Sequence, residues 1–195
     1  MSEGQGVTKV LRTKRLVLRQ FRSDDAQRIH YLLNDKQVAS GAHDMPYPFP
    51  ATAAEEWLVL HKKLVQEGRA AVFAVCLQDP TASNEPPELI GTVGLAIVEV
   101  DQRAEIGYWL GRKYWGNGFC TEAVVAVVEY GFEDLGLHRI FAQHISRNVA
   151  SARVLEKAGF SKEGVFRQHA RKWGVFEDAV CYGMLCSDQR PSCDS

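Results

Sequence analysis

The sequence EIGYWLGRKYWGNGFCTEA, from Glu105 to Ala123, decides the fold of this chain. Its first part alternates like a strand, and a short turn follows that contains Gly116 and Gly118. From Phe119 onward the chain stays apolar over about sixteen residues without a turn signal, which is too long for a typical strand and indicates a helix. Because this helix is apolar on nearly all sides, we expect it to be buried against a sheet. The stretch therefore predicts a strand, a tight glycine turn and a buried helix.

Outward from this stretch, hydrophobic periodicity and turn residues predict the remaining elements. Strands are expected at residues 16–21, 72–77, 89–100, 103–110, 138–145, 161–172 and 176–186. Helices are expected at residues 24–33, 53–66, 119–134 and 148–157. The proline-rich passage at residues 40–50 cannot continue a helix and is expected to be a loop. The order of these elements predicts an α/β, or α+β layered, domain with a mixed sheet.

The composition is typical of a globular protein with no surface for nucleic acid or membrane. Of 195 residues, 46% are hydrophobic and 24% are charged, and the formal net charge is −1. No stretch is apolar enough to span a bilayer, and residues 1–10 lack a signal-peptide core, so we expect a cytoplasmic protein. The length suits one domain, expected at residues 10–187, with flexible tails at residues 1–9 and 188–195.

The cysteines and histidines form neither a disulfide nor a metal pattern. The five cysteines include no CxxC pair, and the six histidines include no HExxH motif, so we expect free thiols and no metal. Cys120 raises the alternative of a covalent acyl-enzyme, because the start of a helix would lower its pKa. No histidine stands beside it in sequence, which disfavours that alternative. His43 is either a contact for a substrate or, more commonly, a surface histidine.

The glycine turn before the buried helix favours an anion site. Gly116 and Gly118 allow backbone N–H groups to approach a ligand, and the free N–H groups at the helix start add positive potential. A pyrophosphate is the natural occupant, and a purely structural turn is the alternative. No Gly-Lys-Ser/Thr sequence marks a P-loop, and Thr121 stands where a dinucleotide fingerprint needs its third glycine. ATP and NAD binding by those routes is therefore excluded.

Two motif blocks resemble a known family. The turn, Lys113-Tyr114-Trp115-Gly116-Asn117-Gly118, is similar to the acyl-CoA-binding motif Arg/Gln-x-x-Gly-x-Gly/Ala of the GNAT superfamily. The second block lies downstream and reads Asn148-x-x-Ser151, followed by VLEKAGF at residues 154–160. Their sequence and order resemble the RimJ/RimL-type branch, the ribosomal-protein alanine N-acetyltransferases. The resemblance covers roughly residues 12–186.

This resemblance implies a fold and an activity. The expected fold is a mixed, mostly antiparallel sheet of about seven strands with about four flanking helices and a splayed cofactor cleft. Acetyl-CoA is the expected co-substrate, and its acetyl group passes directly to a primary amine. The acceptor is either the α-amine of a protein N-terminus or a small molecule such as an amino acid, a polyamine or an antibiotic. A non-catalytic acyl-CoA sensor is the alternative from another class, and the family includes monomers and homodimers.

The resemblance also assigns the cofactor site. The backbone of Tyr108, Trp109 and Leu110 is expected along the pantetheine arm. Asn148 is expected to hydrogen-bond that arm, with Ser151 near the thioester sulfur. The pyrophosphate is expected at Lys113, Gly116, Asn117, Gly118, Phe119, Cys120 and Thr121. Lysine at the first of these positions keeps the positive charge but loses the bidentate geometry of arginine.

Two side chains are candidates for the chemistry. An amine is mostly protonated at neutral pH, so transfer of the acetyl group to it needs a general base that removes the proton. Glu105, on the strand that leads to the cofactor site, is the first choice. Its alternative is an exposed strand glutamate paired with Arg103 or Arg139. The hydroxyl of Ser151 would hydrogen-bond the leaving thiolate, or the residue would serve only in the cap of its helix.

Two segments are expected to line the entrance for the acceptor. Trp173 follows the basic stretch at residues 167–172 and is expected near a hairpin tip. The proline-rich passage at residues 40–50 is the other expected wall, because loops on a rigid scaffold commonly carry specificity.

Overall fold

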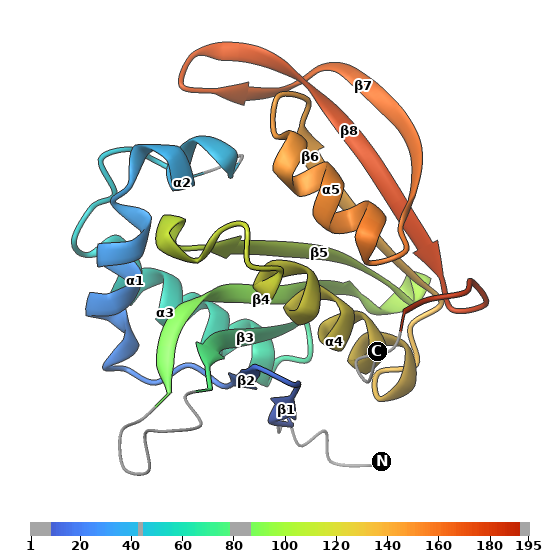
Figure 1. The fold of residues 1–195 in the computed structure, drawn as a ribbon, viewed down its shortest axis with the longest axis horizontal. Coiled ribbons are helices and arrows are strands. Elements are labelled where there is room, and N and C mark those ends of the chain that lie inside the picture. Colours follow the sequence, from blue (N-terminus) through green and yellow to red (C-terminus); the bar gives the residue numbers. More distant parts are fainter. Residues whose placement is uncertain (1–8, 43–44, 79–86, 192–195) are drawn as a thin grey trace.

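The computed structural model describes residues 9–42, 45–78 and 87–191. Within these ranges the chain forms eight β-strands and five α-helices (Figure 1). The strands are β1 (Leu11–Arg12), β2 (Leu16–Arg19), β3 (Ala70–Leu77), β4 (Glu88–Val98), β5 (Arg103–Leu110), β6 (Arg139–Ile145), β7 (Ser161–Lys172) and β8 (Val175–Leu185). The helices are α1 (Asp25–Leu33), α2 (Lys36–Gly41), α3 (Ala53–Gln66), α4 (Phe119–Glu133) and α5 (Val149–Lys157).

All of these strands belong to one sheet, in the order β1-β2-β3-β4-β5-β6-β8-β7. β5 and β6 run parallel, and every other neighbouring pair runs antiparallel. Parallel strands need a crossover connection, which α4 supplies between β5 and β6. The prediction of a layered α/β domain with a mixed, mostly antiparallel sheet is confirmed.

The structure contains two short elements that the sequence did not predict, the strand β1 and the helix α2. β1 has only two residues, so no alternating pattern can reveal it in the sequence. α2 begins just before the passage expected to be a loop. The carboxylate of Asp35 accepts a hydrogen bond from the N–H of Gln37 at 2.7 Å and caps this helix. Its six residues are too few to show helical periodicity.

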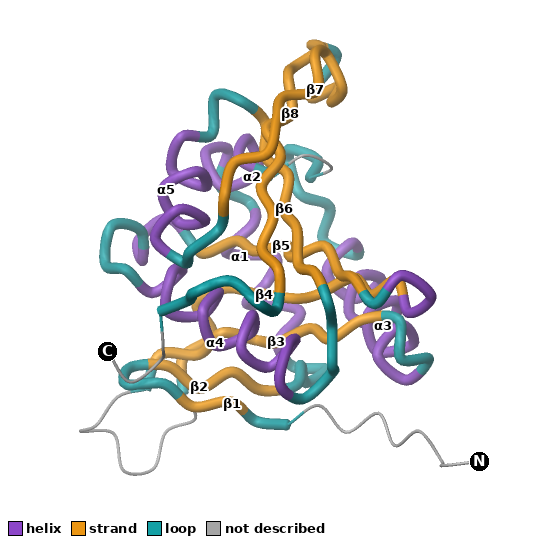
Figure 2. The backbone as a smooth tube through the Cα atoms, turned by 90° about the vertical axis from the view of Figure 1, so that its right-hand side faces the viewer, coloured by secondary structure: helices purple, strands orange, loops and turns teal. Residues whose placement is uncertain are grey.

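Helices cover both faces of the sheet, and each face has its own apolar core. Figure 2 shows α4 and α5 on one side of the sheet and α3 on the other. Side chains of β3 point alternately to the two cores: Phe73 and Val75 pack in the cluster that contains α4, whereas Cys76 packs with α1 and α3. α4 is buried along most of its length, as its uniformly apolar sequence predicts. Neither α4 nor any other helix of the described ranges has the length and apolar character needed to cross a membrane.

β7 and β8 form a long hairpin that arches toward α2 (Figure 1). Trp173 lies at its tip, as predicted, with a φ of 48°. The hairpin ladder is interrupted between Phe166 and Ala170, where Gln168 has a φ of 49°. β7 is an edge strand of the sheet. Such interruptions and the charged side chains of β7 disfavour pairing with a foreign strand.

Candidate active site

β5 and β6 pair only at their beginnings and then separate. The parallel ladder ends at the pair of Glu105 and Phe141, the third along β5. Beyond this point β5 stays paired with β4 as far as Leu110, and β6 stays paired with β8 as far as Ile145. The inner edges of both strands are therefore unpaired over their second halves. An extended ligand can bind to such an edge by main-chain hydrogen bonds.

The alternation of β5 decides which backbone groups face this open edge. The N–H of Gly111 donates to a carbonyl oxygen of β4 at 2.9 Å. Because alternate residues direct their backbone groups to opposite edges, Tyr108 and Leu110 face the open edge and Trp109 faces β4. The indole N–H of Trp115 donates to the carbonyl oxygen of Leu110 at 2.8 Å and closes the end of the edge. Of the three residues predicted along the pantetheine arm, Tyr108 and Leu110 therefore direct backbone groups to the open edge, and the carbonyl oxygen of Leu110 already accepts from Trp115.

The turn after β5 presents a cluster of N–H groups. Gly116 and Gly118 have φ values of 76° and 79°, a region that glycine alone adopts readily. A Cβ at Gly116 would meet open space. The first helical bond of α4 runs from the N–H of Glu122 to the carbonyl oxygen of Gly118 at 3.1 Å. Among the described residues, the N–H groups of residues 119–121 have no backbone acceptor, so they are free to bind an anion.

Arg15, in the turn between β1 and β2, fixes the glycine turn from outside. Its Nη1 donates to the carbonyl oxygen of Asn117 at 2.9 Å, and its guanidinium lies 4.6 Å from the ring centroid of Phe119. Its Nη2 lies 3.4 Å from where a Cβ at Gly118 would be. The role of Arg15 is not predictable from the sequence, because no local signal connects it with a turn 102 positions away.

The carboxylate of Glu122 holds Arg15 in this position. It accepts hydrogen bonds from the Arg15 Nε at 2.7 Å and from the Thr13 hydroxyl at 2.6 Å. Burial alone would raise the pKa of Glu122, but the hydrogen bonds from Thr13 and Arg15 outweigh it and lower that pKa. The carboxylate therefore stays ionised at neutral pH and keeps the contact between the first strands and α4.

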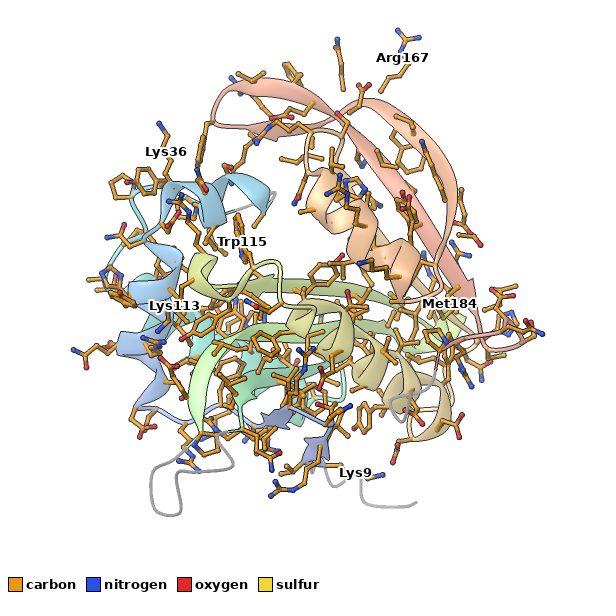
Figure 3. The ribbon with its side chains drawn as sticks, viewed as in Figure 1. Lys9, Lys36, Lys113, Trp115, Arg167 and Met184 are labelled. Carbon is orange, nitrogen blue, oxygen red and sulfur yellow. The ribbon has the colours of Figure 1, made fainter. Side chains whose placement is uncertain are left out.

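Two predicted pyrophosphate contacts have protein partners in this structure. The ammonium group of Lys113 lies 3.1 Å from the Glu88 carboxylate and 4.8 Å from the ring centroid of Tyr114. Figure 3 shows Lys113 on the α1 side of the turn. The side-chain amide of Asn117 donates to the carbonyl oxygen of Trp115 at 3.0 Å. Both side chains are thus engaged within the protein, whereas the backbone N–H groups of residues 119–121 are free.

The second motif block forms the start of α5. The side-chain oxygen of Asn148 accepts a hydrogen bond from the Ser151 N–H at 3.2 Å, which confirms that this block caps the helix. The amide nitrogen of Asn148 donates to the carbonyl oxygen of Gly41 in α2 at 3.0 Å. The hydroxyl of Ser151 lies 2.9 Å from the Tyr108 hydroxyl of β5. This contact joins the two sides of the splayed strand pair.

Glu105 lies on the opposite face of β5 from this hydroxyl pair. Its side chain is exposed, whereas the neighbours Ala104 and Ile106 are buried in the cluster that contains α4. The two arginines considered as its partners bind other carboxylates: Arg103 binds Asp101 at 2.9 Å and Arg139 binds Glu163 at 2.7 Å. Along the strand, Glu105 belongs to the last residue pair before β5 and β6 separate.

Cys120 does not have the character of a nucleophile. Burial raises the pKa of its thiol to about 12, so the expected lowering by the helix start is wrong. Desolvation of the thiolate outweighs the potential of the helix here. The described cysteines, Cys76, Cys120, Cys181 and Cys186, are free thiols. His43 lies outside the described residues.

The two expected acceptor walls contact each other. Lys172, almost fully buried near the hairpin tip, donates from Nζ to the carbonyl oxygens of Ala42 at 2.5 Å and Met45 at 2.6 Å. The rings of Tyr47 and Trp173 lie 6.3 Å apart. The hairpin tip thereby holds the segment that follows α2. No sequence motif singles out Lys172 for this role.

An open pocket lies between the start of α5 and the hairpin tip. Its lining includes Ser146, Arg147, Gln168, Trp173, Phe176 and Glu177. Arg147 binds both carboxylate oxygens of Glu177, at 2.7 and 2.9 Å, and also donates to a carbonyl oxygen of α2 at 3.1 Å. The hairpin tip, one of the two segments expected at the acceptor entrance, thus lines the pocket, and Arg147 connects the pocket to α2.

A parallel strand pair that splays beside a cluster of free amide N–H groups is the arrangement that the resemblance to the N-acetyltransferases predicts. A family model described as the acetyltransferase (GNAT) domain matches residues 15–161. The chain belongs to the GNAT acetyltransferase family, and its predicted resemblance to the RimJ/RimL-type branch is confirmed.

Individual relatives share most of the chain. An uncharacterized N-acetyltransferase, p20, of Bacillus licheniformis is 33% identical over 178 residues, covering 91% of this chain and 96% of p20. The ribosomal protein uS5 alanine N-acetyltransferase of Escherichia coli is 28% identical over 191 residues and covers 93% of both chains. The solved structure of Mycobacterium smegmatis RimJ in complex with CoA-disulfide has a TM-score of 0.83 at 20% identity, covering 96% of this chain and 92% of RimJ. This last likeness shows the shared fold.

Proposed function

We propose that the chain transfers the acetyl group of acetyl-CoA directly to the α-amine of a protein N-terminus. One observation carries the acetyl-CoA part of the proposal: β5 and β6 separate after Glu105 and Phe141, and the glycine turn lies at the end of the open β5 edge. An extended pantetheine arm fits the backbone groups of Tyr108 and Leu110. A pyrophosphate fits the free N–H groups of residues 119–121. The known relatives supply the precedent for both the donor and the acceptor.

The placement of the two reactive side chains on opposite faces of β5 supports direct transfer. The pair of Ser151 and Tyr108 lies on the side of α4 and α5, where the leaving sulfur of CoA is expected. Glu105 lies on the other face, open to solvent, where an amine can approach. The amine nitrogen then attacks the thioester carbonyl carbon from the Glu105 side, and the tetrahedral intermediate breaks its carbon–sulfur bond and releases the thiolate on the side of Ser151. The raised pKa of Cys120 agrees with this path, because a neutral thiol is a poor nucleophile.

An α-amine suits an exposed carboxylate base better than a lysine side chain does. At pH 7 about one α-amine in ten is already neutral, because its pKa is about 8. Fewer than about one lysine side chain in a thousand is neutral, because its pKa is about 10.4. Glu105 then needs only to accept a proton from an amine whose pKa lies close to neutral pH. The open pocket beside the hairpin tip also suits the chain of a peptide acceptor.

The test is release of the CoA thiol from acetyl-CoA in the presence of matched peptides. Each peptide opens with Ala or Ser and contains one lysine, and its control carries a blocked N-terminus with the same lysine. Turnover with the free peptide alone supports the proposal. Turnover only with a small amine supports acetyl-CoA as the donor but refutes a protein N-terminus as the acceptor. Tight binding of acetyl-CoA without turnover on any amine indicates the non-catalytic sensor.

A further inference from the structure

The hydroxyl of Ser151 has one close partner in the described part of the chain. The Tyr108 hydroxyl lies 2.9 Å from the Ser151 Oγ and 3.3 Å from the Ser151 carbonyl oxygen. The tyrosine belongs to the splayed half of β5, and the serine belongs to the first turn of α5. The backbone N–H of Ser151 is already fixed by Asn148, so the position of the serine is set independently of its hydroxyl.

Two arrangements of the hydroxyl protons fit these distances. In the first, Tyr108 donates to the Ser151 Oγ, and the serine proton is free to point toward a ligand. In the second, Tyr108 donates to the Ser151 carbonyl oxygen, and the serine donates to the tyrosine oxygen. Hydroxyl protons rotate to suit their surroundings, so a negative charge at the open edge selects the first arrangement.

We propose that Tyr108 is a positioning residue that directs the hydroxyl proton of Ser151 toward the sulfur of CoA as the thiolate forms. The inference rests on the proposed function, which places that sulfur beside Ser151. As the carbon–sulfur bond breaks, the sulfur keeps the bonding electron pair. The serine O–H donates a hydrogen bond to this charge, and the tyrosine O–H supports the serine oxygen. No proton leaves Tyr108, and solvent supplies the proton of the released thiol.

The surroundings of Tyr108 suit a donor that remains protonated. Its side chain packs against the cluster that contains α4, where burial, Cys120 and Tyr182 raise the pKa of the phenol, and the hydrogen bond with Ser151 only partly opposes them. The phenol of Tyr108 therefore stays protonated at neutral pH. Tyr108 consequently acts through Ser151 by hydrogen bonding and not as a general acid.

This arrangement favours the transition state over the bound substrate. A thioester sulfur is a weak acceptor, whereas a thiolate is a strong one, so the hydrogen bond strengthens as the bond breaks. Interactions that strengthen only in the transition state raise kcat and leave substrate affinity unchanged. Loss of one hydrogen bond to a charged group corresponds to about a tenfold loss of kcat.

The experiment titrates the thiol of bound CoA, which needs no acceptor. The ultraviolet absorbance of the thiolate is followed with pH for the saturated CoA complex, and the same titration of the complex with desulfo-CoA is subtracted. The variants are Tyr108→Phe, Ser151→Ala and the double variant. Tyr182→Phe is the matched control. The Tyr182 hydroxyl also binds α5, donating to the Glu156 carboxylate at 3.0 Å, but Tyr182 lies on β8 and does not contact Ser151 by a hydrogen bond.

In the wild type and in Tyr182→Phe, we expect the bound thiol to titrate about one pH unit lower than in Tyr108→Phe. Ser151→Ala should show at least the same rise, and the double variant should equal Ser151→Ala. A wild-type titration in Tyr108→Phe overturns the inference. Independent, additive shifts also overturn it, because Tyr108 would then not act through Ser151. Failure of the wild type to bind CoA at all refutes the proposed function itself, and the inference with it.

Discussion

The substitution Gly118→Trp tests the position of the phosphate site most directly. Gly118 has a φ of 79°, and a Cβ there would lie 3.4 Å from the Arg15 Nη2, directly before the residues 119–121 whose N–H groups are free. The left-handed conformation costs a non-glycine residue about 1–2 kcal/mol in the free energy of unfolding. Each hydrogen bond from an N–H to a phosphate contributes about 1.5–3 kcal/mol. Losing two of them raises the Kd of acetyl-CoA at least about a hundredfold.

Gly136→Trp is the matched control. Gly136 has a φ of 63°, lies beyond the other end of α4, and has open space around its Cβ direction. Both variants should lose the same stability in urea unfolding, but only Gly118→Trp should lose acetyl-CoA affinity in calorimetric titration. An unchanged Kd in Gly118→Trp refutes the placement of the pyrophosphate. An equal loss of affinity in both variants shows that backbone strain, and not obstruction, is responsible.

Three further substitutions test the other parts of the site and fold. Glu105→Gln should lower kcat and alter the pH–rate profile while the Kd of acetyl-CoA stays constant; wild-type turnover and pH dependence would remove it as the base. Arg15→Gln should raise the Kd of acetyl-CoA roughly fivefold, by about 1 kcal/mol, because the turn loses its anchor at Glu122; an unchanged Kd in calorimetry would show that the turn holds without it. The hydrogen bond from Arg139 holds the pKa of Glu163 below its usual value, so Glu163→Gln should cost less than about 1 kcal/mol of unfolding free energy at pH 7. Because a lowered folded pKa stabilises above the unfolded pKa, this difference should fade as pH falls below about 4, and urea unfolding that shows a constant difference would contradict it.

The element order was predictable because its signals are local. The apolar run after Phe119 is too long for a strand, and it forms the buried helix α4. Gly116 and Gly118 both adopt positive φ values, as the tight turn predicted at these positions requires. Short elements escaped prediction: β1 has too few residues for a pattern, and α2 depends on the Asp35 cap more than on periodicity.

The candidate site was predicted only in part, because sequence gives positions without partners. Glu105 and Ser151 could be named as candidates, but their placement on opposite faces follows from the pairing of β5 and from the position of α5. Lys113 carries the charge expected of a phosphate contact, yet Glu88 binds it on the other side of the turn. The raised pKa of the Cys120 thiol follows from its burial at the start of α4, which arises from tertiary packing and cannot be read from the sequence.

The sequence by itself determined the strand–turn–helix order, the glycine turn and the family of the chain, because periodicity, turn chemistry and motif spacing depend on neighbouring residues. Only the tertiary structure decided that Arg15 anchors the glycine turn and that Lys172 holds the segment after α2. It alone brought the Tyr108 hydroxyl to Ser151 across the splayed strands. These contacts join residues from 43 to 127 positions apart, and they form only when the packing of helices on the sheet brings those distant side chains together.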